Sequence, residues 1–204
     1  RGLAPDHTLI LVNGKRRHRG AVITWNGNGI SNGSQGPDIS VIPTIALKSV
    51  EVLRDGASSI YGSDAIAGVI NFQLQDASDG GKLELRSGQY SAGDGQQTTV
   101  AMNKGFELGT NGFVNMSLEY GNADATSRSK QRVDAAALID AGFQDVPNPA
   151  MIWGKPKVNN DIKLFLNFGG DLGGGTEMYG YANNNSKTVD GGFFFRNPTN
   201  RGGV

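Results

Sequence analysis

The chain has no cysteine, no net charge and no long apolar run, and each absence excludes a class of protein. Without cysteine among the 204 residues, a disulfide framework and a thiolate metal site are excluded. The 19 Lys and Arg residues balance the 19 Asp and Glu residues, so the charge gives no support for nucleic-acid binding. No apolar stretch approaches the ~20 residues of a membrane-spanning helix. No basic and apolar signal peptide opens the sequence either.

Patterns of catalysis and metal binding are also scarce. His7 and His18 are the only histidines, and no further residues complete a ligand set with metal spacing. The serine pair at 58–59 has no nearby base to activate it. The glycine-containing segment 62–68 lacks the Lys-Ser/Thr ending of a phosphate-binding loop. We therefore expect no enzyme, no metal site and no bound cofactor.

Residues 1–75 predict a compact unit of short strands separated by glycine turns. Strands are indicated at 9–12, 50–53 and 65–72, since each is apolar and the first two end at Asn-Gly or Asp-Gly. A single helical turn is expected at 57–61, closed by Gly62 in a left-handed cap. Gly56, Gly62 and Gly68 are expected to adopt positive φ or to allow close backbone approach. A small soluble α+β domain fits these patterns equally well.

After a polar linker at 76–81, the sequence changes to segments in which apolar and polar residues alternate. This pattern predicts antiparallel strands with one apolar face, and the segments are 82–90, 98–108, 113–121, 161–169 and, less clearly, 176–186. A soluble sheet with one wet face gives the same alternation. However, Lys, Glu, Arg and Asn fill the second face, and the tight connections at 109–112 and 170–175 contrast with the long one at 122–160. Short turns on one side and long loops on the other are typical of outer-membrane β-barrels.

Two irregular segments leave alternatives open. Residues 122–160 are polar and are expected to form an extracellular loop, with a short helix at 133–141 capped by Gly142. A disordered insertion is the alternative. Residues 192–198 contain three consecutive phenylalanines, which indicate either a ligand-facing aromatic patch or an interfacial anchor.

The motifs in residues 1–75 resemble those of TonB-dependent outer-membrane receptors. Ile42-Pro43 begins a run through Ile45, Val50-Glu51-Val52-Leu53-Arg54, Tyr61-Gly62 and Gly68-Val69-Ile70-Asn71 that is similar to part of the family's plug domain. Arg1-Gly2-Leu3 and Leu11-Val12-Asn13-Gly14-Lys15 are similar to an earlier plug motif. The resemblance implies the C-terminal part of an α+β plug (1–75), a linker (76–81) and the first antiparallel strands of a transmembrane β-barrel (82–204). A plug-holding barrel needs about 22 strands, so we expect a fragment that lacks the signal, the coupling segment and the first plug half.

The resemblance also suggests a ligand-facing loop. The basic cluster after the Asn13-Gly14 turn is by itself most often solvated. In the family, the corresponding segment faces the extracellular vestibule, where cations form charge-assisted hydrogen bonds to anionic or oxygen-rich ligands. The residues expected at this site are Arg17, His18, Arg19, Trp25, Asn26 and Asn28.

A second expected site joins the plug to the barrel. The resemblance places Arg54 where the family bonds to carboxylates on the barrel wall, with Glu51 in the same network. Asp55 departs from the family motif, in which glycine follows the arginine directly. Local pairing of Arg54 with Asp55 and a simple surface ion pair of little energetic worth are therefore the alternatives.

The function implied by the resemblance is active import across the bacterial outer membrane. The expected ligand is a ferric siderophore, a cobalamin-like cofactor or an oligosaccharide. The expected partners are outer-membrane lipid and the TonB complex, the latter through a segment that this sequence does not cover. The alternatives are a passive outer-membrane channel or adhesin, and a soluble β-rich binding protein.

Overall fold

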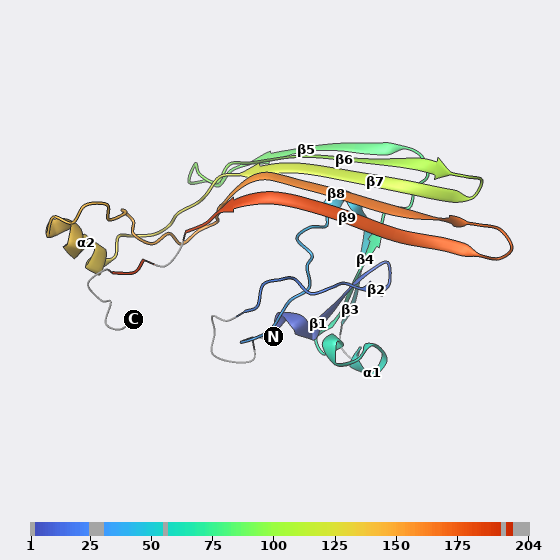
Figure 1. The fold of residues 1–204 in the computed structure, drawn as a ribbon, viewed down its shortest axis with the longest axis horizontal. Coiled ribbons are helices and arrows are strands. Elements are labelled where there is room, and N and C mark those ends of the chain that lie inside the picture. Colours follow the sequence, from blue (N-terminus) through green and yellow to red (C-terminus); the bar gives the residue numbers. More distant parts are fainter. Residues whose placement is uncertain (1–2, 25–30, 55–56, 193–194, 198–204) are drawn as a thin grey trace. The chain divides into compact units, whose positions relative to one another are not determined.

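The computed structural model describes residues 3–24, 31–54, 57–192 and 195–197. The chain divides into two compact units. The first comprises Arg1–Glu84, Ala101–Glu119 and Lys163–Asn185, and the second comprises Leu85–Val100, Tyr120–Ile162 and Ser186–Val204. Figure 1 shows the strands of the two sheets described below.

The N-terminal sheet has four strands in the order β2-β1-β4-β3. These are β1 (Thr8–Val12), β2 (Lys15–Arg16), β3 (Leu47–Arg54) and β4 (Gly68–Leu74). β1 runs parallel to β4, whereas β2 and β3 are antiparallel to their neighbours. The last four residues of β1 are all buried. A strand that is buried on both faces has an apolar run without alternation, as β1 does. The strand predictions for this part of the chain are confirmed.

Short helical turns complete this part of the first unit. They are η1 (Pro5–His7), η2 (Thr44–Ala46), α1 (Ser58–Tyr61) and η3 (Ser63–Ala65). Beside them, one side of the sheet forms a small core of Leu9, Leu11, Ala57, Ala65 and Val69. The single helical turn predicted from the sequence is therefore present.

Two of the predicted glycine positions have the expected positive φ. Gly68, the first residue of β4, has φ 133°. A Cβ there would lie 2.5 Å from the Leu53 carbonyl oxygen on β3, so only glycine fits at this position. Gly62 has φ 92° but ψ −175°, so the left-handed cap predicted there is wrong. The chain leaves α1 in an extended direction instead and enters η3. Gly56 lies outside the described residues.

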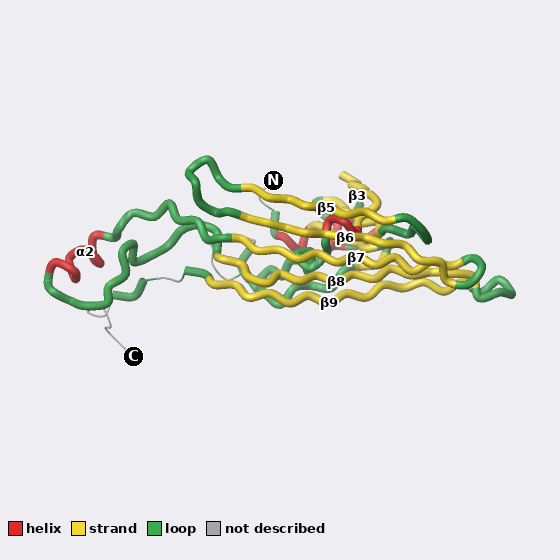
Figure 2. The backbone as a smooth tube through the Cα atoms, turned by 90° about the horizontal axis from the view of Figure 1, so that it is seen from above, coloured by secondary structure: helices red, strands yellow, loops and turns green. Residues whose placement is uncertain are grey.

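The second sheet has five strands in sequential order, β5-β6-β7-β8-β9 (Figure 2). They are β5 (Gly81–Gly88), β6 (Gln97–Leu108), β7 (Gly112–Ala123), β8 (Lys157–Asp171) and β9 (Glu177–Asp190). All five predicted strands are present, including the unclear one at 176–186. The connections at 109–111 and 172–176 are short, whereas 124–156 is long.

The two faces of the second sheet differ as the alternation predicts. One face exposes apolar side chains, among them Leu83, Leu85, Met102, Phe106, Met116 and Leu118. The opposite face buries polar ones, including Asn115, Ser117, Glu119 and Asn167. On that face Lys163 Nζ lies 2.9 Å from Glu119 Oε1, so two charges are paired where little water reaches them. An apolar exterior with a covered polar interior is the reverse of a soluble sheet packed on an apolar core.

Within the second unit, the long connection 124–156 forms an ordered ribbon. Thr126 N donates to Lys155 O at 3.1 Å and Arg128 N to Trp153 O at 3.3 Å, so the two arms pair along their length. At its end lies α2 (Val133–Asp140), followed by Gly142 at φ 84°. The predicted helix is confirmed, and the pairing replaces the alternative of a disordered insertion. In the part of the chain that the structure describes, no helix has the length and apolarity to cross a membrane.

Candidate functional site

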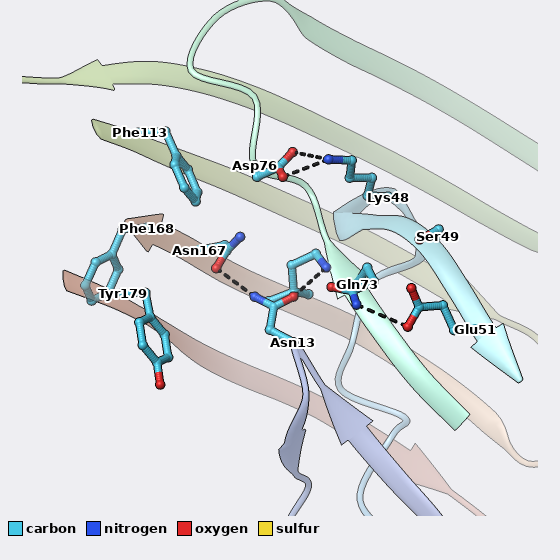
Figure 3. A pocket seen from close by; sticks show the side chains of 11 residues that line it. Asn13, Lys48, Ser49, Glu51, Gln73, Asp76, Phe113, Asn167, Phe168 and Tyr179 are labelled. Atoms are coloured by element: carbon cyan, nitrogen blue, oxygen red, sulfur yellow. Dashed lines mark hydrogen bonds and ion pairs between the residues drawn. The ribbon is translucent and has the colours of Figure 1, made fainter. Parts of the chain in front are cut away.

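Within the first unit, the turn between β1 and β2 contacts the polar face of β8. Asn13 has φ 47°, a conformation that asparagine tolerates better than most residues. Its Nδ2 donates to Asn167 Oδ1 at 3.2 Å, and its Oδ1 accepts from Leu74 N at 2.9 Å (Figure 3). The turn predicted at Asn13-Gly14 therefore has a second task, since it joins the N-terminal sheet to a strand of the second sheet.

An apolar contact lies beside this turn. Phe165 is 1 % exposed and packs with Val12, Ala46 and Leu74. Its ring stacks on Tyr181, with centroids 5.9 Å apart. This contact also resolves the unclear alternation in β9, because it places the Tyr181 face toward the N-terminal sheet.

Arg17 is buried, whereas it was expected to project into the vestibule as a ligand contact. Only 2 % of its side chain is exposed. Its Nε donates to Asp38 O at 2.8 Å, and its Nη1 donates to Asn183 Oδ1 at 3.3 Å. The guanidinium therefore links the segment after β2 to Asp38 and to β9. A buried cation needs such hydrogen-bond partners to offset its loss of water. Local sequence patterns do not distinguish Arg17 from His18 and Arg19 in this respect.

His18 and Arg19 keep the exposure expected of ligand-facing residues. The His18 side chain is 62 % exposed, and its Nε2 lies 3.5 Å from Asp38 Oδ2. Arg19 is exposed, and its backbone forms an isolated bridge with Pro37. Trp25, Asn26 and Asn28 lie outside the described residues.

The contacts to β9 give the direction of the basic segment. Lys15 Nζ lies 5.4 Å from the ring centre of Tyr179, close to the short 172–176 connection, whereas Arg17 reaches Asn183 farther along the strand. Interaction with the Tyr179 side chain raises the pKa of Lys15 above its usual value. The segment thus runs away from the short connections of the sheet.

Glu51 makes its described contacts within the N-terminal sheet. Its Oε2 accepts from Asn71 Nδ2 at 2.8 Å and from Gln73 Nε2 at 3.2 Å. Arg54 is exposed at the end of β3, opposite Gly68. The expected contact of Arg54 with carboxylates of the barrel wall stays a prediction.

A cavity of about 390 Å³, lined by both polar and apolar side chains, adjoins these contacts (Figure 3). Lys48 and Asp76 form an ion pair at its edge, with Nζ–O distances of 2.8 and 2.9 Å. Asn13, Glu51 and Asn167 also line it. Across the described ranges, no three His, Cys, Asp or Glu residues are grouped so that they could hold a metal ion.

Three asparagines of this region, Asn13, Asn71 and Asn167, were not singled out as functional residues from the sequence. Asn13 was visible only as half of a turn signal, and Asn71 only as the end of a motif. Asn167 was one of several polar residues on the alternating face. Their shared role depends on contacts between residues 154 positions apart, which local patterns do not reveal.

Comparisons with known proteins identify this arrangement. Residues 1–69 match the model of the TonB-dependent receptor plug domain. A probable TonB-dependent siderophore receptor, PirA of Acinetobacter baumannii, is 42 % identical over 73 residues, which are 35 % of this chain and 9 % of that protein. The iron-regulated outer membrane virulence protein of Vibrio cholerae is 35 % identical over 118 residues, 56 % of this chain and 16 % of that protein.

The fold has a solved counterpart as well. The ferric enterobactin receptor PfeA of Pseudomonas aeruginosa, in a mutant form in complex with enterobactin, aligns with a TM-score of 0.62 at 19 % identity. The alignment covers 91 % of this chain and 26 % of that one. The chain therefore spans only a small part of the proteins that it matches, none of which is named as an enzyme.

The N-terminal sheet with its helical turns is a receptor plug, and β5–β9 are strands of a β-barrel wall. Residues 1–69 are a plug domain of the TonB-dependent receptor type, and the whole chain is similar to a segment of such outer-membrane receptors.

Proposed function

We propose that the receptor containing this chain is a ligand-gated importer that carries an iron–siderophore chelate across the outer membrane. The observation that carries this proposal is the docking of the plug sheet on the polar face of the wall strands, through Phe165, Arg17 and Asn167. A plug fastened to the inner side of a lipid-compatible wall closes the pore. Import then requires that some of these contacts open.

The wall strands are suited to lipid on their other face. Lipid offers no water to the backbone, so strands cross a membrane only within a closed barrel. The exposed Phe106, Met116 and Leu118 fit the apolar outer band of such a barrel. Energy for moving the plug would come from the TonB complex, acting through a segment outside this sequence.

The proposed ligand contacts are His18 and Arg19, together with Trp25 and Asn26. Exposed cationic and amide groups suit an oxygen-rich anionic chelate, to which they donate charge-assisted hydrogen bonds. Arg17 takes a different part. Held by Asp38 and Asn183, it fixes the loop from which His18 and Arg19 project.

A siderophore is favoured over a cobalamin-like cofactor or an oligosaccharide by the relatives. PirA is named as a probable siderophore receptor, and PfeA was solved with enterobactin bound. For Glu51 and Arg54 we propose a plug–wall role: Glu51 through Asn71, to which it is bonded, and Arg54 through carboxylates of further wall strands.

Growth of a strain lacking the full-length receptor gene tests the proposal. The strain and its complemented parent are grown under iron limitation with one ferric siderophore at a time, and separately with cobalamin or an oligosaccharide as the limiting nutrient. Receptor-dependent growth on at least one ferric siderophore is expected. Growth that depends on the receptor only with cobalamin or a glycan would contradict the proposed ligand class.

A further inference from the structure

Asn13, in the β1–β2 turn, is bonded both to the end of β4 and to wall strand β8. Its backbone N–H donates to Phe72 O at 2.9 Å, and its Oδ1 accepts from Leu74 N at 2.9 Å, so the residue closes the end of β4. Its Nδ2 is left to donate to Asn167 Oδ1 on wall strand β8. Asn13 and Asn167 belong to the same compact unit of the structure.

Neighbouring amides extend this contact in both directions. Asn71 Oδ1 accepts from Gly14 N at 3.0 Å, while its Nδ2 donates to Glu51 Oε2 at 2.8 Å. On the wall, Asn167 Nδ2 donates to Gln75 O at 2.9 Å. These hydrogen bonds, joined by the backbone between Asn13 and Gly14, therefore connect Glu51 on β3 through the β1–β2 turn to β8.

The contact between Asn13 and Asn167 differs from the plug–wall contacts made by Phe165 and Arg17. Phe165 is buried among apolar side chains, and Arg17 is a buried cation, so opening either one exposes an apolar surface or leaves a charge poorly paired. The Asn13–Asn167 bond joins two neutral amides that both line the open cavity of about 390 Å³. Water in that cavity can replace each half of a neutral amide bond at little cost.

We propose that the Asn13–Asn167 hydrogen bond is a releasable latch between plug and wall, and that it must open for the plug to move during import. The proposal rests on the proposed function. It makes Asn13 and Asn167 positioning residues: they hold the closed plug without contacting the ligand. Glu51 supports the latch from inside the plug, through Asn71.

Reversible cross-linking of the latch tests this proposal in the full-length receptor. Asn13→Cys and Asn167→Cys are combined, and a short bis-methanethiosulfonate reagent, whose disulfide links are cleaved by reductant, joins the two thiols. Residues 1–204 contain no other cysteine. Cells with the cross-linked receptor should bind a ferric siderophore as before but lose its uptake, and reductant should restore it.

The matched control joins two wall strands and leaves the plug free. Asn103 Nδ2 donates to Ser117 Oγ at 2.8 Å across β6 and β7, so Asn103→Cys with Ser117→Cys accepts the same reagent. Uptake should persist in this cross-linked control. Undiminished uptake by the 13/167 cross-link, or equal loss in the wall control, would overturn the latch.

An isosteric variant tests the contact without a cross-link. Asn13→Asp keeps the oxygen that accepts from Leu74 N but sets a carboxylate against Asn167 Oδ1. Hydrogen exchange in the segment 71–75 of the purified receptor should rise several-fold, whereas Asn103→Asp, whose partners lie on the wall, should leave it unchanged. Unaltered exchange in Asn13→Asp would refute the latch. This measurement stands even if the wild-type receptor imports no siderophore, in which case the proposed function fails separately.

Discussion

Arg17 and Arg19 are two positions apart in the same basic cluster, yet the structure gives them different tasks. Arg17→Ala would leave Asp38 and Asn183 without their cation. Loss of a buried charged hydrogen-bond partner typically costs about 1–3 kcal/mol of stability. We therefore expect Arg17→Ala to lower the unfolding temperature of the full-length receptor in detergent. Unchanged stability would show that Arg17 does not anchor the loop.

Arg19→Ala is expected to act on the ligand instead. The side chain is exposed, so its removal should hardly change the unfolding temperature. If Arg19 donates to an anionic chelate, affinity should fall by roughly 1.5–3 kcal/mol per charged hydrogen bond. Calorimetric titration of the purified receptor measures this. Wild-type affinity in Arg19→Ala would return the residue to plain solvent contact.

Phe165 tests the apolar part of the docking. Truncation of a fully buried phenylalanine typically costs about 3–5 kcal/mol. Phe165→Ala should therefore loosen the plug, while Phe165→Leu, which keeps most of the apolar volume, should cost much less. Denaturant unfolding, monitored by hydrogen exchange in the plug strands, measures the difference in stability between the two variants. Equal stability of Phe165→Ala and the wild type would contradict the packing against Val12 and Leu74.

The β-strands show how far sequence reasoning reaches. Alternation located all five wall strands and the correct faces of β6, β7 and β8, because a side-chain period of two is a local property. It could not assign the face of β9, where tyrosine and asparagine share one side. That face is fixed by Phe165, which stacks on Tyr181 from the neighbouring strand. The burial of Arg17 escaped prediction for the same reason, since its partner Asn183 is 166 positions away.

The ion pair between the ribbon at 124–156 and the connection at 89–96 should respond to acid. The hydrogen bond from Arg128 lowers the pKa of Asp94 below its usual 3.8. The stabilisation is therefore complete above the unfolded pKa and is lost as pH falls through the lower folded value. Hydrogen exchange in the 89–96 connection, corrected for the intrinsic rate, should rise only below about pH 4. Asp94→Asn should raise it at neutral pH and remove the acid dependence; an unchanged acid response in that variant would contradict the pairing.

The receptor as a whole should present the long connections outside the cell and the short ones to the periplasm. A cysteine at Ser127 should react with an impermeant maleimide added to intact cells, whereas one at Thr110 should react only after the outer membrane is permeabilised. Both positions are exposed in the structure, so burial does not bias the comparison. The reverse labelling pattern would invert the orientation.

In the proposed importer, the plug closes a pore that opens only when work is done on it. Uptake of a radioactive ferric siderophore by cells carrying the full-length receptor, with and without a proton uncoupler, measures this most directly. We predict that the uncoupler abolishes accumulation in the periplasm while binding at the cell surface persists. Receptor-dependent accumulation that is insensitive to the uncoupler would identify a passive channel and contradict energy-driven import.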